Sequence, residues 1–323
     1  MSDAKSTAQA VVTARELNWR QGIPIAIMVA AFAVAPLFVY PVFLMKALCF
    51  ALFACAFNLL IGYVGLLSFG HAMFFGSAAY AAAYTAKVYG FPPELAILTG
   101  TAIAAILGAL VGALAIRRQG IYFAMITLAL AQMVYFICLR SEFTGGENGI
   151  QAVPRGRLFF VLDLNNTMVL YYSVLGIFLL GFLLIRRIVH SPFGQVLKAI
   201  RENEPRAVSL GYKPNQYKLI VFVLSAALSG LAGGTKAIVF QLASLTDVHW
   251  NTSGEVILMT LLGGLGTILG PVVGALMVTG LENYLAQFGA WVTVVEGTIF
   301  VICVLTFRRG LIGELSRLLK RPL

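Results

Sequence analysis

The sequence contains few charged residues. Asp, Glu, Lys and Arg make up 11% of its 323 residues, whereas hydrophobic residues make up 60%. An average soluble domain is about 25% charged, so this chain has too few charges to cover a surface that faces water. Its mean hydropathy of +0.90 excludes disordered, coiled-coil and collagen-like chains. The chain is therefore predicted to be an integral membrane protein.

Cysteine is scarce as well, and its four positions exclude a metal site or a disulfide framework. Cys49, Cys55, Cys138 and Cys303 lie within apolar runs and form no CxxC or Cys–His pattern. We interpret them as small apolar core residues and expect no bound metal.

Motifs that would mark an enzyme are absent. The sequence contains no GxxxxGKS/T phosphate-binding loop, no HExxH, no GxSxG and no pair of carboxylates at helical spacing inside an apolar run. We therefore expect no catalytic residues and no cofactor bound by this chain, and the phosphate-binding loop through which it could bind ATP is missing. An intramembrane enzyme is the least favoured function.

Long apolar runs are what the chain has in abundance. About 20 apolar residues form a helix that crosses about 30 Å of hydrocarbon. The candidate spans are 23–40, 42–62, 71–89, 94–116, 120–139, 167–185, 216–240, 253–265, 268–286 and 290–307. The predicted fold class is all-α: a polytopic transmembrane helix bundle of about ten spans with Gly-rich broken helices.

The basic residues predict the orientation of this bundle. With the N-terminus in the cytoplasm, 17 of the 23 Lys and Arg residues fall in inside segments, as the positive-inside rule requires. The net charge of +10 is thus a topology signal and not a sign of a nucleic-acid partner. Residues 1–22 are predicted to form a cytoplasmic tail, 23–307 the transmembrane domain, and 308–323 a basic cytoplasmic tail.

The run 253–265 is too short to cross a membrane by itself, yet a cytoplasmic C-terminus requires that it crosses. We expect a broken helix whose irregular part faces protein or a cavity, because lipid would leave its backbone unpaired. Gly263, Gly264 and Gly266 mark the expected break.

Glycine also recurs at spacings that predict helix packing and a candidate repeat. Gly108 with Gly112 predicts close helix approach, and so does Gly230 with Gly234. Residues 60–70 resemble residues 261–270 in the order of Leu and Gly, although the match is short. Interrupted helices at matching positions surround the substrate path of many transporters, so this path is expected between the two segments.

The longest polar connection predicted inside the cell is the loop 188–215. Ser191 can cap a helix that begins at Pro192 and runs to about Asn203. A second short turn follows and ends at Gly211, which favours a left-handed cap.

The predicted helix is amphipathic, with aliphatic and polar residues on opposite faces. Such a helix can lie among lipid headgroups or dock into a groove of another protein. The polar face carries both Arg201 and Glu202, a mixture that suits a protein groove better than anionic lipid. Docking is therefore favoured.

Five segments together resemble the LivM-type permeases, which are membrane subunits of ABC importers for branched-chain amino acids. The segments are SPFGQVLKAIRENE (191–204), NLLIGY (58–63), LSFGHA (67–72), TGGENGI (144–150) and LGGLGT (262–267). The resemblance covers nearly the whole chain beyond the N-terminal tail.

The resemblance implies that the helix 192–203 is a coupling helix, which sits in a cleft of a separate ATPase and transmits its closure. The residues assigned to this contact are Pro192, Phe193, Gly194, Leu197, Ala199, Ile200, Arg201, Glu202, Glu204, Ala207 and Gly211. The last three match the EAA loop of other importer families only loosely.

The same resemblance implies partners and a location. The partners are a second, LivH-like permease, two ATP-binding subunits that hold the ATP, and a periplasmic or extracellular substrate-binding protein. The location is the bacterial inner (plasma) membrane, where the chain also contacts lipid.

Six residues in or near the spans are candidates for the translocation pathway. Glu255 is one because a charge inside a span is a sign of function, and Gly263, Gly264 and Gly266 are candidates because they mark the expected break. Ser68 and His71 are included because the resemblance implies that their segment lies beside the path. For His71 the alternative is a hydrogen-bonding role in the bundle. For Glu255 and Lys236 it is a structural pair or snorkelling to the interface, and Glu296 is expected to form a hydrogen bond within the bundle.

Three polar residues of the outer segment 140–166 are candidates for docking the binding protein. They are Glu142, Glu147 and Asn148, and residues 241–252 provide further polar surface there. A solvated connector is the alternative interpretation of this segment.

The first functional hypothesis is a permease subunit that moves branched-chain or related small amino acids inward. A self-sufficient secondary carrier or channel for a small polar solute is the alternative, because broken helices alone allow it. The sequence leaves the substrate open, since close relatives handle urea, amides and other amino acids. It also leaves open whether the permease pair is a homodimer or a heterodimer.

Overall fold

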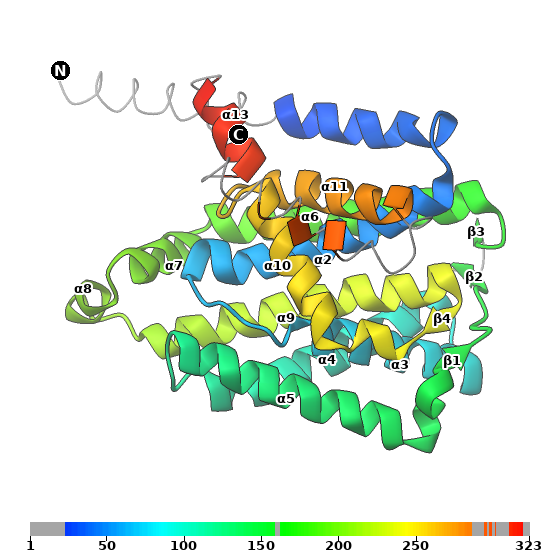
Figure 1. The fold of residues 1–323 in the computed structure, drawn as a ribbon, viewed down its shortest axis with the longest axis horizontal. Coiled ribbons are helices and arrows are strands. Elements are labelled where there is room, and N and C mark those ends of the chain that lie inside the picture. The colour runs from blue at the N-terminus through cyan, green and yellow to red at the C-terminus, as the bar shows by residue number, and fades with distance from the viewer. Residues whose placement is uncertain are drawn as a thin grey trace, which may run out of the picture.

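The computed structural model describes residues 23–158 and 162–285, together with 294–295, 297–298, 301 and 310–318. Within these residues the chain is a bundle of long helices (Figure 1). The apolar helix Ile23–Leu37 comes first. The later long helices are α2 (Pro41–Val64), α3 (His71–Val88), α4 (Pro93–Ala115), α5 (Ile121–Arg140), α6 (Thr167–His190), α9 (Pro214–Phe240), α10 (Trp250–Gly263) and α11 (Gly270–Leu285).

Short elements gather at the two ends of the bundle. One end, here called the coupling end, carries α7 (Pro192–Glu202), α8 (Glu204–Ser209) and α13 (Gly310–Leu318). The other, the strand end, carries the strands β1 (Ile150–Gln151), β2 (Arg157–Leu158), β3 (Leu162–Asp163) and β4 (Leu242–Ala243), and the 3-10 turns η2 (Glu142–Thr144) and η3 (Gly146–Asn148). Strand β1 pairs with β4, and β2 with β3, both antiparallel.

Contacts between connections confirm that successive spans alternate in direction. At the coupling end, Gln119 donates a hydrogen bond to Glu204, with 3.0 Å between Nε2 and Oε2. At the strand end, Lys87 donates to the backbone oxygen of Gln151, with 2.8 Å between Nζ and O. The connections predicted to be inside therefore meet at one end and those predicted to be outside at the other. Which end faces the cytoplasm stays a prediction.

Nine of the ten predicted spans correspond to described helices. Among the described residues, five helices are long and apolar enough to cross a membrane by themselves: α2, α4, α5, α6 and α9. Most of the predicted span 290–307, and Glu296 with it, lies outside the described residues.

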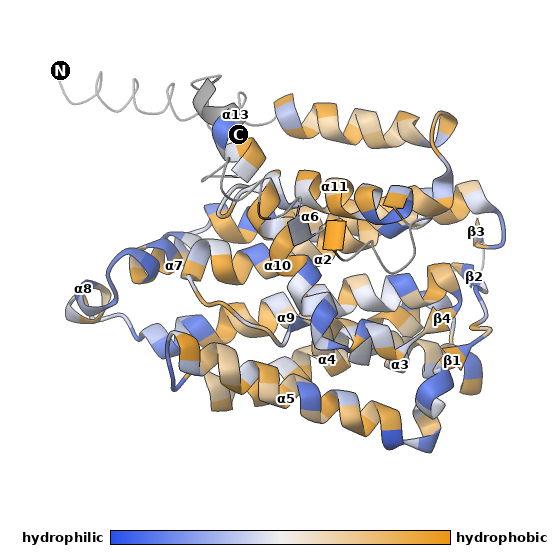
Figure 2. Ribbon diagram, in the orientation of Figure 1, coloured by the Kyte–Doolittle hydropathy of each residue, from blue (hydrophilic) through white to orange (hydrophobic). Residues whose placement is uncertain are grey.

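Helix α2 forms the centre of the bundle. It is apolar on all sides, and 94% of its most apolar stretch is buried inside the protein, whereas the value for α5 is 28%. A helix that is hydrophobic all round must be buried in protein or lipid; α2 is buried inside this protein, whereas most of α5 lies on the outside of the bundle. Figure 2 shows apolar residues along the long helices and hydrophilic residues gathered at α7, α8 and β3.

Glycine allows α4 and α9 to pack closely, as the predicted small-residue pairs require. A Cβ atom on Gly108 would lie 2.5 Å from the Cβ of Ala226, and a Cβ on Gly230 would collide with Ala104. Side chains larger than hydrogen do not fit at these points. These glycines therefore serve helix packing.

The short run near 253–265 crosses the bundle, but the break lies elsewhere than predicted. After β4 at the strand end, the chain passes through the turn η4 (Leu245–Asp247) along α3, with Asp247 beside Gly76. Helix α10 then begins at Trp250, and Ser253 accepts a hydrogen bond from the backbone N–H of Ala72 (2.9 Å). The irregular part thus precedes the helix and packs against protein.

The run from Gly263 to Gly266 ends α10 instead of breaking it. Gly264 and Gly266 have positive φ angles of 120° and 75°, and α11 begins at Gly270, whose backbone touches Gly263. The two helices therefore form a tight hairpin at the coupling end. The sequence alone did not distinguish a broken helix from a helix end followed by a turn, because glycine serves both.

The packing role of glycine makes a prediction with a matched control. Gly108→Ala adds a methyl group against Ala226 and is expected to cost about 1–3 kcal/mol of stability through overpacking. Gly176→Ala adds the same group on α6 with nothing within 4 Å, so it should leave the stability unchanged or raise it slightly. Thermal unfolding in detergent would measure both. A decrease that is equal in the two variants would contradict the packing account.

Candidate coupling junction and membrane path

Helix α7 forms where the sequence predicts it. Its first residue is Pro192, and the side chain of Ser191 caps it by accepting from the N–H of Gly194 (3.3 Å). It ends at Glu202, one residue before the predicted Asn203. The Phe193 ring stacks on Tyr217 of α9, with 5.6 Å between centroids, which attaches the helix to the bundle.

The predicted coupling residues of α7 divide into two faces. Gly194, Leu197 and Ile200 are buried inside the chain, and a Cβ on Gly194 would collide with the last turn of α6. Residues at the opposite face, Ala199 and Glu202, are exposed. The buried residues hold α7 in place, and only the exposed face is available to another protein.

The second short helix, α8, is also anchored from within the chain. Glu204 pairs with Lys218 of α9, with 2.7 Å between Oε1 and Nζ, and Lys218 is almost fully buried. Ala207 is buried, and Gly211 has the expected left-handed conformation with φ of 88°. Glu204 therefore serves to fix α8, whatever else it contacts.

Arg201 connects α7 to the ends of two other helices. Its guanidinium donates a hydrogen bond to the backbone oxygen of Gly62 at the end of α2. The same group lies beside Gly266 in the turn between α10 and α11, and its aliphatic part packs on Gly65. These contacts border a cavity of about 410 Å³. We call this meeting point of α7, the α2 end and the α10–α11 turn the coupling junction.

Asn58 joins the two glycine-rich segments at this junction. It is almost fully buried; its Oδ1 accepts from the N–H of Gly266 (3.0 Å) and its Nδ2 donates to the oxygen of Thr267 (2.8 Å). Gly62 also lies against the backbone N–H of Gly266, so the two segments that resemble each other in sequence are in direct contact. Asn58 satisfies backbone groups that the turn leaves unpaired.

Ser68 and His71 lie inside the packing between helices. Both are fully buried. The Nε2 atom of His71 lies 2.9 Å from the Oγ of Ser225, which in turn donates to the oxygen of Ala56 (2.5 Å). Aromatic rings surround His71, with Phe57 closest at 4.9 Å between centroids. In this conformation neither residue faces open space, and His71 has the hydrogen-bonding role given as the alternative.

The other predicted path residues are on α10 and its turn. Glu255 is half-buried, on the same helix face as the exposed Asn251. Gly263 and Gly264 are buried and Gly266 is half-buried. The structure thus brings Gly266 to the coupling junction and Glu255 to a different part of the bundle.

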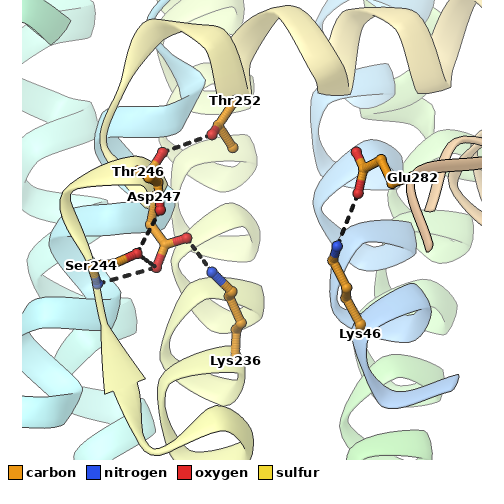
Figure 3. Close-up of polar contacts among 7 residues, drawn as sticks. All are labelled: Lys46, Lys236, Ser244, Thr246, Asp247, Thr252 and Glu282. Carbon is orange, nitrogen blue, oxygen red and sulfur yellow. Dashed lines mark hydrogen bonds and ion pairs between the residues drawn. The ribbon is translucent and has the colours of Figure 1, made fainter. Parts of the chain in front are cut away.

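An ion pair that the sequence did not reveal holds the irregular segment before α10. The ammonium group of Lys236 on α9 binds the carboxylate of Asp247, and the two side chains are 16% and 5% exposed. Asp247 also accepts from the backbone N–H of Ser244 (3.4 Å), and Thr252 donates to the oxygen of Thr246 (2.8 Å) (Figure 3). Lys236 thus has the structural pair given as an alternative, with Asp247 as its partner.

A second ion pair joins helices α2 and α11. Lys46 of α2 binds Glu282 of α11, with 2.9 Å between Nζ and Oε2 (Figure 3). It is more exposed than the Lys236–Asp247 pair, since the Lys46 side chain is 35% exposed.

The strand end carries the predicted docking residues. Glu142, Glu147 and Asn148 are all exposed, on the turns η2 and η3. The pairing of β1 with β4 joins the two outer segments that the sequence identified as polar surface. These residues and the segment 241–252 therefore lie at the same end of the bundle.

Sequence reasoning missed several residues that the structure brings to these sites. Gln195, Val208 and Leu210 are also exposed at the coupling end, although none of them was assigned to the ATPase contact. Asn58 stood inside a resembling segment, but its partners are more than 200 residues away. A buried Asn in an apolar run is a signal that could have identified it.

The fold and the junction define a class of protein: a polytopic helical membrane protein with an amphipathic helix fixed at one end. A family model described as "branched-chain amino acid transport system / permease component" matches residues 40–304. The chain belongs to this family, as the resemblance predicted.

Individual relatives agree with this assignment. The chain is 27% identical over 279 residues to the high-affinity branched-chain amino acid transport system permease protein LivM of Escherichia coli (strain K12), covering 79% of this chain and 65% of that protein. It is 30% identical over 186 residues to a probable LivM permease of Methanocaldococcus jannaschii, covering 54% and 52% of the two chains.

A sugar permease is also similar. The ribose import permease protein RbsC of Bacillus subtilis (strain 168) is 29% identical over 196 residues, covering 56% of this chain and 58% of that protein. The alignment with LivM of Escherichia coli spans 65% of the length of that relative. No solved structure matches the chain.

The Lys236–Asp247 pair gives a prediction for stability. Asp247→Asn leaves an ammonium group largely buried without its counter-charge, which is expected to cost about 3–5 kcal/mol. The double variant Lys236→Met/Asp247→Leu removes both charges and should recover much of this loss. Thermal unfolding in detergent measures the effect, with Lys46→Met at the more exposed pair as a milder control. If Asp247→Asn unfolds no earlier than Lys46→Met, the pair does not hold the segment.

Proposed function

We propose that this chain is a permease subunit of an ABC importer that moves branched-chain or related small amino acids inward. The relatives named as branched-chain amino acid permeases support the substrate class, although a ribose permease is also similar. The coupling junction carries the proposal, because it fixes one exposed helix against two helix ends that border the bundle interior. Such an arrangement can transmit a movement of a partner protein at the membrane surface to the helices of the bundle.

The energy would come from two separate ATP-binding subunits, since the sequence has no phosphate-binding loop of its own. They would contact the exposed face of α7 and α8, which includes Ala199, Glu202 and Leu210. Closure of the ATPases would move α7, and Arg201 would transmit the displacement to the α2 end and to the α10–α11 turn.

The remaining parts of the assembly follow from the same proposal. A second, LivH-like permease would complete the membrane part, and an external substrate-binding protein would dock at the strand end near Glu142, Glu147 and Asn148. The location would be the bacterial inner membrane, with the coupling end in the cytoplasm. The chain itself is proposed to bind no cofactor and to catalyse no reaction.

Uptake by the reconstituted assembly tests this proposal. Proteoliposomes with both permeases, the ATPases and the binding protein should accumulate leucine, isoleucine or valine only when ATP is supplied. Urea and ribose, scanned in parallel, should compete poorly. Uptake driven by an ion gradient with this chain alone would instead show a secondary carrier.

A variant pair at Ala199 tests the coupling surface. Ala199→Arg places a large charge on the exposed face of α7 without disturbing the buried face, so the permease should fold but bind the ATPases poorly. We expect uptake to fall by about tenfold or more, as for an interface position that costs at least about 1.4 kcal/mol. Ala199→Ser keeps the size small and should retain uptake. Equal uptake by Ala199→Arg and the unmodified protein would exclude this face as the docking site.

A further inference from the structure

A long apolar crevice lies between α3, α4 and α5. Helices α3 and α4 pack closely against each other, whereas α5 approaches them only in part. The space left between the three helices has a volume of about 540 Å³. Its walls are one face of α3 from Ser77 to Thr85, Ile103 and Leu107 of α4, and Cys138 with its neighbours on α5. We call this space the lateral crevice.

The lateral crevice is narrow and runs along the helices. Its wall on α3 extends from Ser77 to Thr85, which is about 12 Å at 1.5 Å per residue. Its volume of about 540 Å³ over this length gives a mean cross-section of about 45 Å². An α-helix with its side chains is at least about 10 Å across and needs about 80 Å². The crevice is therefore too narrow for a further helix, whereas an extended hydrocarbon chain fits.

The walls of the crevice offer little polar contact. Three of the hydroxyl groups at the crevice already donate to backbone oxygens: Ser77 to Phe74, Thr85 to Ala81 and Thr144 to Cys138. The rims are apolar as well, since Ile103, Ile137 and Phe143 are large exposed apolar residues. A water molecule in a cavity needs about two to four polar partners, so this space favours an apolar occupant.

One polar group at the crevice has no partner. The side chain of Tyr80 is 4% exposed, and its hydroxyl oxygen is buried without a hydrogen-bond partner among the described residues. A buried hydroxyl that stays unpaired costs free energy, and the hydroxyl of a buried Tyr usually finds a partner. An occupant of the crevice that carries an acceptor at the level of Tyr80 would supply one.

The depth of Tyr80 indicates what kind of acceptor this is. Tyr84, one turn closer to the strand end, contacts the ring of Phe143, with 6.2 Å between centroids. Phe143 belongs to the turn η2, which also carries the exposed Glu142 and so lies at the water-facing surface. One turn is about 5–6 Å, and the headgroup region of each leaflet is about 5–8 Å thick. Tyr80 is therefore at the level where hydrocarbon begins and where the ester groups of a lipid lie.

We propose that the lateral crevice binds a membrane lipid, with one acyl chain in the crevice and the ester carbonyl of that chain accepting a hydrogen bond from Tyr80. The chain extends past Ser77 and Leu107 toward the middle of the bundle, and the headgroup lies at the strand end. The bound chain fills the space between α5 and the α3–α4 pair, as packed side chains do elsewhere in the bundle. This site depends on the chain lying in a membrane and is independent of the proposed solute and ATPases.

Photolabelling tests whether lipid enters the crevice. The assembled transporter is placed in nanodiscs of phosphatidylethanolamine that carries a photoactivatable diazirine in one acyl chain, and labelled peptides are identified by mass spectrometry. We expect label on the crevice walls of α3 and α5. Ala81→Trp fills the crevice and should remove most of this label, whereas Ala109→Trp, at an exposed position of α4, should leave it unchanged. Equal labelling in the two variants would overturn the proposal, and so would unlabelled walls in the unmodified transporter, the result expected if the second permease covers the crevice.

The hydrogen bond is tested with two lipids that differ only in the link to the labelled chain. The ester-linked lipid should compete for the crevice about fivefold better than its ether-linked counterpart, which lacks the carbonyl, as expected for one hydrogen bond of ordinary strength. Tyr80→Phe should remove this preference and still admit lipid, whereas Tyr84→Phe, one turn away, should keep it. Equal competition by the two lipids in the unmodified protein, or a preference that survives in Tyr80→Phe, would refute the bond to Tyr80.

Discussion

The structure depends on one constraint: in a membrane bundle, each backbone group that leaves helical pairing must find another partner. The chain leaves helical conformation at the turn between α10 and α11, at the coupling end, and at the segment before α10, which packs along α3. In the turn, Asn58 accepts a hydrogen bond from the N–H of Gly266 and donates one to the oxygen of Thr267. In the segment, Asp247 pairs with Lys236 and accepts a hydrogen bond from the N–H of Ser244. The same polar side chains that satisfy the backbone also connect helices that are distant in the sequence.

This constraint links the coupling end to the interior. The carbonyl of Gly62 at the end of α2 has no partner in its own helix, and Arg201 of α7 supplies one. Because Arg201 also lies against the turn after α10, a movement of α7 reaches both helix ends at once. Helix α10 lies between that turn and the segment held by the Lys236–Asp247 pair, and Ser253 in its first turn accepts a hydrogen bond from Ala72 of α3.

Much of the fold could be predicted from the sequence because its signals are local. Apolar runs of sufficient length predicted the spans, and Ser191 with Pro192 predicted the start of α7. What could not be predicted depends on contacts that form only once the helices are placed against one another. The inward orientation of Gly194 requires knowing where α6 ends, and Asp247 looked like a loop residue until Lys236 was placed beside it. Ser68 and His71 belong to a resembling motif and were expected beside the path, but both are fully buried between helices.

The central claim is that α7 and the α10–α11 turn move as one unit, held together by Arg201. Spin labels at Gln195 on α7 and at Leu265, both exposed, report this directly when distances are measured in nucleotide-free and ATP-trapped transporter. A second pair, from Gln195 to Tyr122 on α5, serves as a reference. If Arg201 holds the unit together, the 195–265 distance stays constant while the 195–122 distance changes. A 195–265 distance that changes as much as the reference would contradict this claim.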